Sequence, residues 1–130
     1  MFRTPQAQAA ISINSDGIVT VGFTGLAGQP SLSVQEVKQF EIGVVVPSMT
    51  SSNIIDPKAV VSAIKDVLRK YKSAPNRIAM VLPDAVAKVT LLTFDKVPEH
   101  EKDLRQLIKL HMQQSAPFDL DDARLSYIRC

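Results

Sequence analysis

Small or apolar residues alternate with polar ones in two short runs near the start of the chain. The runs "AAISIN" and "GIVTVGFT" have the two-residue period of half-buried β-strands. Between them lies Asp16-Gly17, a dipeptide that favours a tight hairpin turn. The pattern predicts two antiparallel strands, Ala9–Asn14 and Gly17–Thr24, joined by that turn.

A third alternation closes the stretch "VQEVKQFEIGVVVP", which follows a loop-like segment rich in Gly, Pro and Ser, "LAGQPSLS". Its apolar residues recur at every second position, so we predict a third strand there. Three later runs, "RIAMVLP", "AVAKVTLLTF" and "ARLSYI", predict further strands, and Pro83-Asp84 separates the first two. The alternating residues of the third strand are Phe40, Ile42, Val44 and Val46.

Two segments show the three- and four-residue spacing of apolar residues that is typical of an amphipathic helix. The first covers residues 56–72, where Asp56 is a favourable N-cap and Pro57 a favourable first helical residue. The second covers residues 98–114. The apolar face of the first is Val60, Ile64, Val67, Leu68 and Tyr71, and the stripe of the second is Leu104, Leu107, Ile108, His111 and Met112.

The predicted order of elements is β-β-β-α-β-β-α-β, with helices packed against a sheet. The long crossover through the first helix predicts that the sheet mixes parallel and antiparallel pairs. The predicted fold class is therefore α+β, a mixed α/β arrangement with at least five strands. We expect Ile64, Leu68, Leu104 and Ile108 to be buried.

Composition and charge are those of an ordinary globular protein. Of 130 residues, 45% are hydrophobic and 22% charged, and the net charge is only +2. Without a basic stripe, and with 5% aromatic residues, nucleic-acid binding is not expected. The single cysteine, Cys130, excludes an internal disulfide, and we find neither a signal peptide nor a run long enough to span a membrane. We therefore expect a cytoplasmic chain, and its abrupt end on a predicted strand suggests a fragment of a longer protein.

Three groups of residues could carry chemistry, and each has a simpler explanation. The turn "NSDG" could wrap a phosphate with backbone N–H groups, but one acidic residue and one glycine are typical of an ordinary hairpin. An acidic cluster could hold a hard cation, but it lacks the glycine and glutamate of a calcium loop. His111 lies on an apolar stripe, where we expect a packed side chain with one hydrogen-bond partner. We predict no metal site and no catalytic residue; the acidic cluster is Asp119, Asp121 and Asp122.

The later part of the chain resembles the family of the type IV pilus assembly protein PilM, an actin-like relative of the cell-division protein FtsA. The resemblance is carried by a strand end "VLP" (81–83), a "VP" pair (97–98) and a helix with several Glu and Gln residues. Its most specific piece is the corner "APFDLDDA" (116–123). The stretch "DPKAVVSAIKDVLRKYK" resembles the helix that precedes this block. The resemblance is good over residues 56–128 and poor before them.

The resemblance implies two subdomains and a degenerate phosphate loop. Residues 1–74 would be part of an actin-like (ribonuclease H-like) subdomain 1A, and residues 75–130 would be the SHS2-like subdomain 1C. The two subdomains could pack together as one unit. The family's first phosphate motif is Asp-x-Gly-(Ser/Thr), and its Asp and Gly positions hold Ser12 and Asn14 here. The lost carboxylate and the added side chain both oppose Mg-nucleotide binding. We predict no cofactor for this chain, whereas a longer parent protein could bind ATP and Mg²⁺. The degenerate phosphate loop consists of Ser12, Asn14, Ser15, Asp16 and Gly17.

The implied role is that of a non-catalytic adaptor in a pilus machine. Its partner would be the short cytoplasmic tail of an inner-membrane protein (PilN-like), which would hold the chain at the inner membrane; self-association is a further expectation. Three alternatives stay open: the N-terminal part of an actin-like ATPase, the cytoplasmic domain of a type II secretion L-type protein, and a stand-alone domain with an unrelated ligand. We expect the tail in a groove beside the first helix and the run "AVAKVTLLTF". The residues expected there are Arg69, Lys70, Lys72, Lys88 and Thr90.

Overall fold

The computed structural model describes residues 6–24 and 31–129, which divide into two compact units, Met1–Val86 and Ala87–Cys130. The predicted α+β class is confirmed, because these residues form a mixed sheet and two α-helices. Most of the loop predicted before the third strand, and Cys130, lie outside the described residues. The family-based division at residue 74 concerns the subdomains of a longer fold and stays a prediction.

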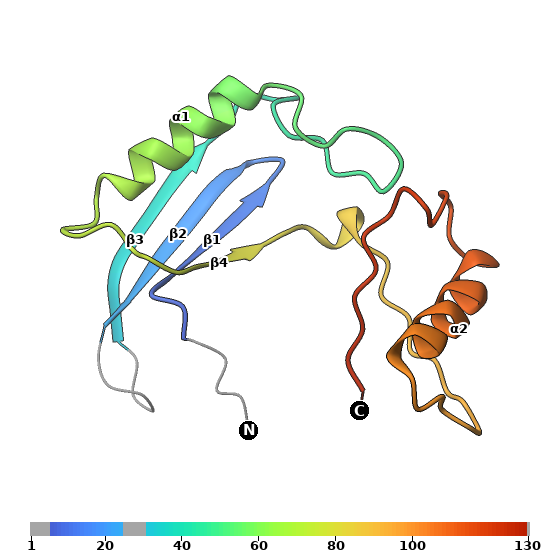
Figure 1. Cartoon of the computed structure of the whole chain (residues 1–130). Helices are drawn as coiled ribbons and strands as arrows, with labels where there is room; N and C mark the ends of the chain where they lie inside the picture. Colours follow the sequence, from blue (N-terminus) through green and yellow to red (C-terminus); the bar gives the residue numbers. More distant parts are fainter. Residues whose placement is uncertain (1–5, 25–30, 130) are drawn as a thin grey trace. The chain divides into compact units, whose positions relative to one another are not determined.

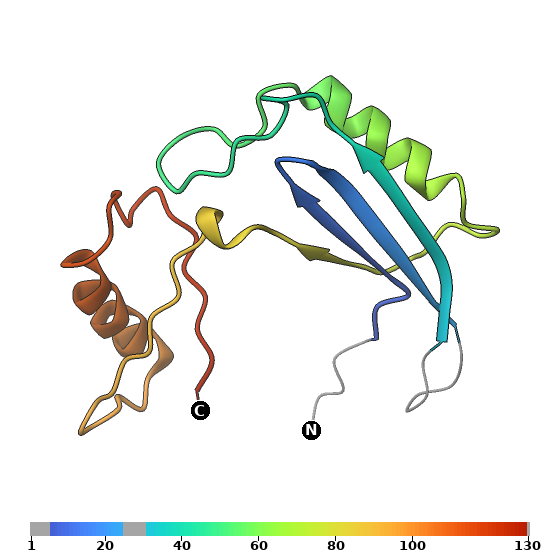
Figure 2. The same ribbon diagram turned by 180° about the vertical axis from the view of Figure 1, so that it is seen from behind.

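A four-stranded mixed sheet with strand order β3-β2-β1-β4 forms the first unit (Figure 1). β1 (Ala9–Asn14) and β2 (Gly17–Thr24) form the predicted hairpin with the predicted bounds. β3 (Ser31–Gln39) pairs antiparallel with β2, and β4 (Ile78–Val81) pairs parallel with β1. Helix α1 (Pro57–Leu68) makes the crossover between β3 and β4 and runs along one side of the sheet in both views (Figure 1, Figure 2). The prediction of a mixed sheet is therefore confirmed.

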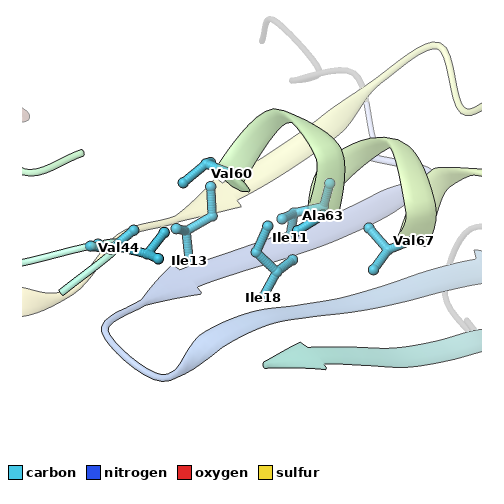
Figure 3. Close-up of a cluster of buried hydrophobic side chains, with 8 residues drawn as sticks. Ile11, Ile13, Ile18, Val44, Val60, Ala63 and Val67 are labelled. Atoms are coloured by element: carbon cyan, nitrogen blue, oxygen red, sulfur yellow. The ribbon is translucent and has the colours of Figure 1, made fainter. Parts of the chain in front are cut away.

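The core of the first unit lies between α1 and the β1–β2 hairpin. Alternate residues of β1 are buried, as the two-residue period of its sequence predicts. Figure 3 shows the side chains of Val60, Ala63 and Val67 directed from α1 towards the isoleucines of the hairpin. The buried cluster consists of Ile11, Ile13, Ile18, Val44, Val45, Val60, Ala63 and Val67.

Helix α1 begins where its sequence predicts. The Asp56 carboxylate accepts hydrogen bonds from the backbone N–H groups of Lys58 (3.0 Å) and Ala59 (3.1 Å), and Pro57 is the first helical residue. These contacts satisfy two N–H groups that have no partner inside the helix. Of the predicted apolar face, Val60 and Val67 are buried, while Ile64, Leu68 and Tyr71 are only half-buried.

The chain after α1 is fixed to the sheet by a buried polar contact. The helix ends at Leu68, four residues earlier than predicted, and the following turn places the Tyr71 hydroxyl 2.7 Å from the hydroxyl of Thr20. Thr20 is fully buried and donates to the carbonyl oxygen of Ala10 (3.1 Å), so the tyrosine hydroxyl is the donor to Thr20. The ring lies against Gly22, where an added Cβ would be 2.7 Å from the ring carbon Cε1. Tyr71 therefore completes the face of the helix beyond its last turn.

The third predicted strand lies in a different place. β3 ends at Gln39, before the alternating residues on which the prediction was based. Gly43 has a φ of +89°, and the N–H of Val44 donates to the carbonyl oxygen of Glu41 (3.3 Å), which turns the chain. Val44 and the adjacent Val45 are then both buried, and Val45 belongs to an isolated bridge rather than to a strand. Residues 40–46 therefore form a turn and then a contact with the core, although their sequence alternates like that of a strand.

The second unit is built around helix α2 (Glu101–Gln113). Leu104 and Ile108 are buried as predicted, together with Leu120 from the corner that follows the helix. The helix begins three residues later than predicted, after His100, whose side chain makes no capping hydrogen bond. The burial predicted for His111 is wrong, because this residue is exposed, but its ring Nδ1 has the expected single partner, the carbonyl oxygen of Leu107 at 2.9 Å.

Two predicted strands are absent from the described part of the chain. Residues 85–94 contain only the end of a short 3-10 helix, η1 (Asp84–Val86), followed by irregular backbone without a strand partner. Residues 123–128 are likewise irregular. The described ranges therefore hold four strands rather than at least five. A strand-forming sequence becomes a regular strand only where a second edge supplies hydrogen bonds, and neither segment has one.

Candidate functional site

The hairpin turn that would correspond to a phosphate loop is closed by its own asparagine. The side-chain oxygen Oδ1 of Asn14 accepts hydrogen bonds from the backbone N–H groups of Asp16 (3.0 Å) and Gly17 (3.2 Å). The Ser15 hydroxyl is 3.4 Å from the Asp16 carboxylate. Backbone N–H groups are what a phosphate loop offers to its ligand, and here two of them already have an internal acceptor. The geometry is that of an Asx turn.

The remaining residues of this loop are also held by the sheet. Ser12 is half-buried in β1, opposite Val19 of β2 and Val81 of β4. A Cβ added to Gly17 would lie 2.1 Å from the carbonyl oxygen of Lys38, so the neighbouring strand β3 leaves no room for a side chain at this glycine. The loop residues are therefore close together, as their sequence requires, but their contacts explain a tight hairpin.

The cations predicted to steer a partner lie at the end of α1. Arg69 is the C-cap and is 3.3 Å from the Asp66 carboxylate, which Lys38 of β3 also approaches at 3.2 Å. Lys70 and Lys72 follow in the turn and are exposed. Arg69 is thus engaged in an ion-pair cluster that links α1 to the sheet edge.

The other two predicted partner residues, Lys88 and Thr90, belong to the second unit. Lys88 is half-buried, and its ammonium group donates to the carbonyl oxygen of Ser115 at 2.8 Å, just beyond the end of α2. Thr90 is exposed. The five predicted residues therefore belong to two units and do not form one constellation within either of them.

Segment 87–94 exposes two of its large apolar residues, while other apolar residues of the segment are half-buried. Val89 and Leu91 are 94% and 84% exposed, whereas Lys88 is half-buried. At the far end the Phe94 ring meets His111 of α2 edge-on, with centroids 5.1 Å apart. Polar side chains usually face water and apolar ones the core, and Lys88, Val89 and Leu91 depart from that rule. Neighbouring exposed apolar side chains are a feature of surfaces that another chain covers.

The backbone of segment 87–94 is also free. Within the described ranges, none of its N–H or C=O groups takes part in a backbone–backbone hydrogen bond. Exposed backbone with unpaired N–H and C=O groups is a place where a peptide can add as a further strand. Sequence reasoning selected this run but chose Lys88 and Thr90 as its outer wall. Thr90 is exposed as an outer wall requires, whereas Lys88 is half-buried and the neighbouring Val89 and Leu91 are exposed.

The corner at 116–123 is held to α2 by several contacts. Leu120 is buried, Lys109 of α2 forms an ion pair with Asp121, and the Asp121 N–H donates to the Asp119 carboxylate at 2.9 Å. The guanidinium group of Arg105 donates to the carbonyl oxygen of Leu125 at 3.2 Å. The acidic residues therefore act in a turn and an ion pair.

No group of three or more His, Cys, Asp or Glu side chains is arranged to hold a metal ion among residues 6–24 and 31–129. Over the same ranges, no helix combines the length and the hydropathy needed to cross a membrane.

Comparison of the chain with family models, with curated proteins and with solved structures gives no match.

Proposed function

We propose that this chain is a non-catalytic adaptor of a type IV pilus assembly machine, which binds the short cytoplasmic tail of an inner-membrane partner. The observation that carries the proposal is the segment 87–94, whose free backbone and exposed Val89 and Leu91 could receive an extended peptide. Main-chain hydrogen bonds would supply affinity, and the apolar side chains would supply selectivity. The resemblance of residues 56–128 to the PilM family supports the choice of partner.

The proposal includes the finer fold assignment. The first unit would be part of an actin-like subdomain, and the second would be the SHS2-like subdomain. Support for the first is the N-terminal hairpin, on which that family carries its phosphate motif. Support for a role without nucleotide chemistry is the Asx turn, because the N–H groups of Asp16 and Gly17 are bonded to Asn14. The chain would work in the cytoplasm, at the inner membrane through its partner.

The experiment is a binding titration with a synthetic peptide of the partner's cytoplasmic tail. Replacing Val89 and Leu91 by Asp should weaken binding at least about tenfold, because it places two charges in an apolar contact. The control is Ile42→Asp, which changes an equally exposed apolar residue in the turn after β3. Equal affinities of the double variant and the unchanged chain would contradict the proposed site. If neither the unchanged chain nor the double variant binds the peptide, the proposed partner is contradicted.

A further inference from the structure

The outer face of α1, remote from the core, has a shallow hollow with lysines at both ends. Its lining residues are Pro57, Lys58, Val61, Ser62 and Lys65, and its volume is about 390 Å³. Val61 is 49% exposed at the centre, although its neighbour Val60 is buried against the sheet. The hollow therefore has an apolar floor, extended by the methylene groups of the two lysines.

The charges around the hollow are unbalanced. Asp56 is occupied as the N-cap of the helix, and Asp66 is shared by Lys38 and Arg69. Within the described ranges, no carboxylate lies within ion-pair distance of Lys58 or Lys65. Both lysines are exposed, so their ammonium groups are available to a ligand.

We propose that this hollow binds an acidic segment of another protein with one apolar side chain between two carboxylates. Lys58 and Lys65 are seven helical residues apart, which is about 10 Å along the axis. In an extended peptide the side chains of residues i, i+2 and i+4 point to the same side, so carboxylates four residues apart, about 13 Å along the chain, flank an apolar side chain midway between them. The long, flexible lysine side chains cover the difference in length. The apolar side chain between them would cover Val61. An anionic membrane surface is a poorer fit, because a helix that lies on a membrane presents a row of large apolar residues, and this face has only Val61.

This surface belongs to the first unit, and it is independent of segment 87–94. The probe is the capped peptide Gly-Glu-Ser-Leu-Ser-Glu-Gly, titrated into the isotopically labelled full chain and followed by amide chemical shifts. The expected shifts are confined to residues 58–65. Combined Lys58→Glu and Lys65→Glu substitutions should weaken binding about tenfold, because both attractive charges become repulsive. Exchanging both glutamates of the probe for glutamine should have the same effect.

The matched control is the combined Lys96→Glu and Lys102→Glu variant. It makes the same change in net charge at exposed lysines of the second unit, and it should leave binding unchanged. Equal weakening by both double variants would contradict the proposal, because net charge alone would then explain the binding. Absence of shifts in residues 58–65 would also contradict it. The proposal would also be contradicted if the peptide gives no shifts while the chain binds phosphatidylserine vesicles and the combined Lys58→Glu and Lys65→Glu variant does not.

Discussion

Two of the described glycines of the first unit have positive φ angles, but only one of them lacks space for a side chain. Gly17, at φ +154°, is the first residue of β2 and lies beside β3, where a Cβ would meet the carbonyl oxygen of Lys38 at 2.1 Å. Gly43, at φ +89°, has nothing within 4 Å of the same position. The two positions therefore separate the cost of backbone conformation from the cost of a collision.

Alanine substitutions at these glycines should differ in their effect on stability. Gly43→Ala should lower the free energy of unfolding by about 1–2 kcal/mol, the cost of a left-handed backbone with a side chain. Gly17→Ala should lower it by about 3 kcal/mol or more, because the hairpin must also move away from β3. Urea unfolding followed by circular dichroism measures both. Equal losses of unfolding free energy in the two variants would contradict the close approach of β3 to Gly17.

At the scale of single elements, α2 organises the second unit with very few buried side chains. Leu104 and Ile108 are buried on one face, while Leu110 on the same helix is 61% exposed. A small core makes each of its members a large part of the local stability.

Leu104→Ala should destabilise the second unit by about 2–5 kcal/mol, because it removes a buried side chain and leaves a cavity. Leu110→Ala is the matched control and should be nearly neutral, since alanine is a good helix former and Leu110 packs little. Amide hydrogen exchange across α2 measures the local stability of both variants. Equal protection in the two variants would contradict the assignment of the buried face.

The elements that sequence reasoning predicted well are those with local signals. The β1–β2 hairpin followed from alternation around Asp16-Gly17, and the start of α1 followed from Asp56 and Pro57. The run at 85–94 was assigned as a strand because its pattern is strand-like, but a strand also needs a partner edge, which no local pattern reveals. Its phase was ambiguous too, since apolar residues occur on both sides, with Leu92 turned inwards and Val89 outwards.

The candidate sites divide in the same way. The hairpin loop was correctly seen as ordinary turn chemistry, because Asn and Gly dictate local hydrogen bonds. The hollow on α1 was not predicted, although Lys58, Val61 and Lys65 have helical spacing. Sequence reasoning assigned charges near a helix end to a partner, and it had no means of knowing that Asp66 neutralises Arg69 rather than Lys65.

At the scale of the whole molecule, the two units differ in how their extended segments are completed. In the first unit, β1 and β2 have neighbours on both sides, and the core lies against α1. In the second unit, segment 87–94 lies against α2 by side-chain contacts alone, including Lys88 to Ser115 and Phe94 to His111. We propose that a partner's strand supplies the backbone hydrogen bonds that segment 87–94 lacks within the described residues.

The most direct test is amide hydrogen exchange of the full chain with and without the partner's tail peptide, resolved residue by residue. In the free chain, the amides of segment 87–94 should exchange rapidly, because they have no backbone acceptor. With the tail bound, every second amide should slow by at least about tenfold, because only one edge of an added strand pair faces the new strand. Exchange that is already slow in the free chain, or that stays unchanged while the tail binds, would contradict the account.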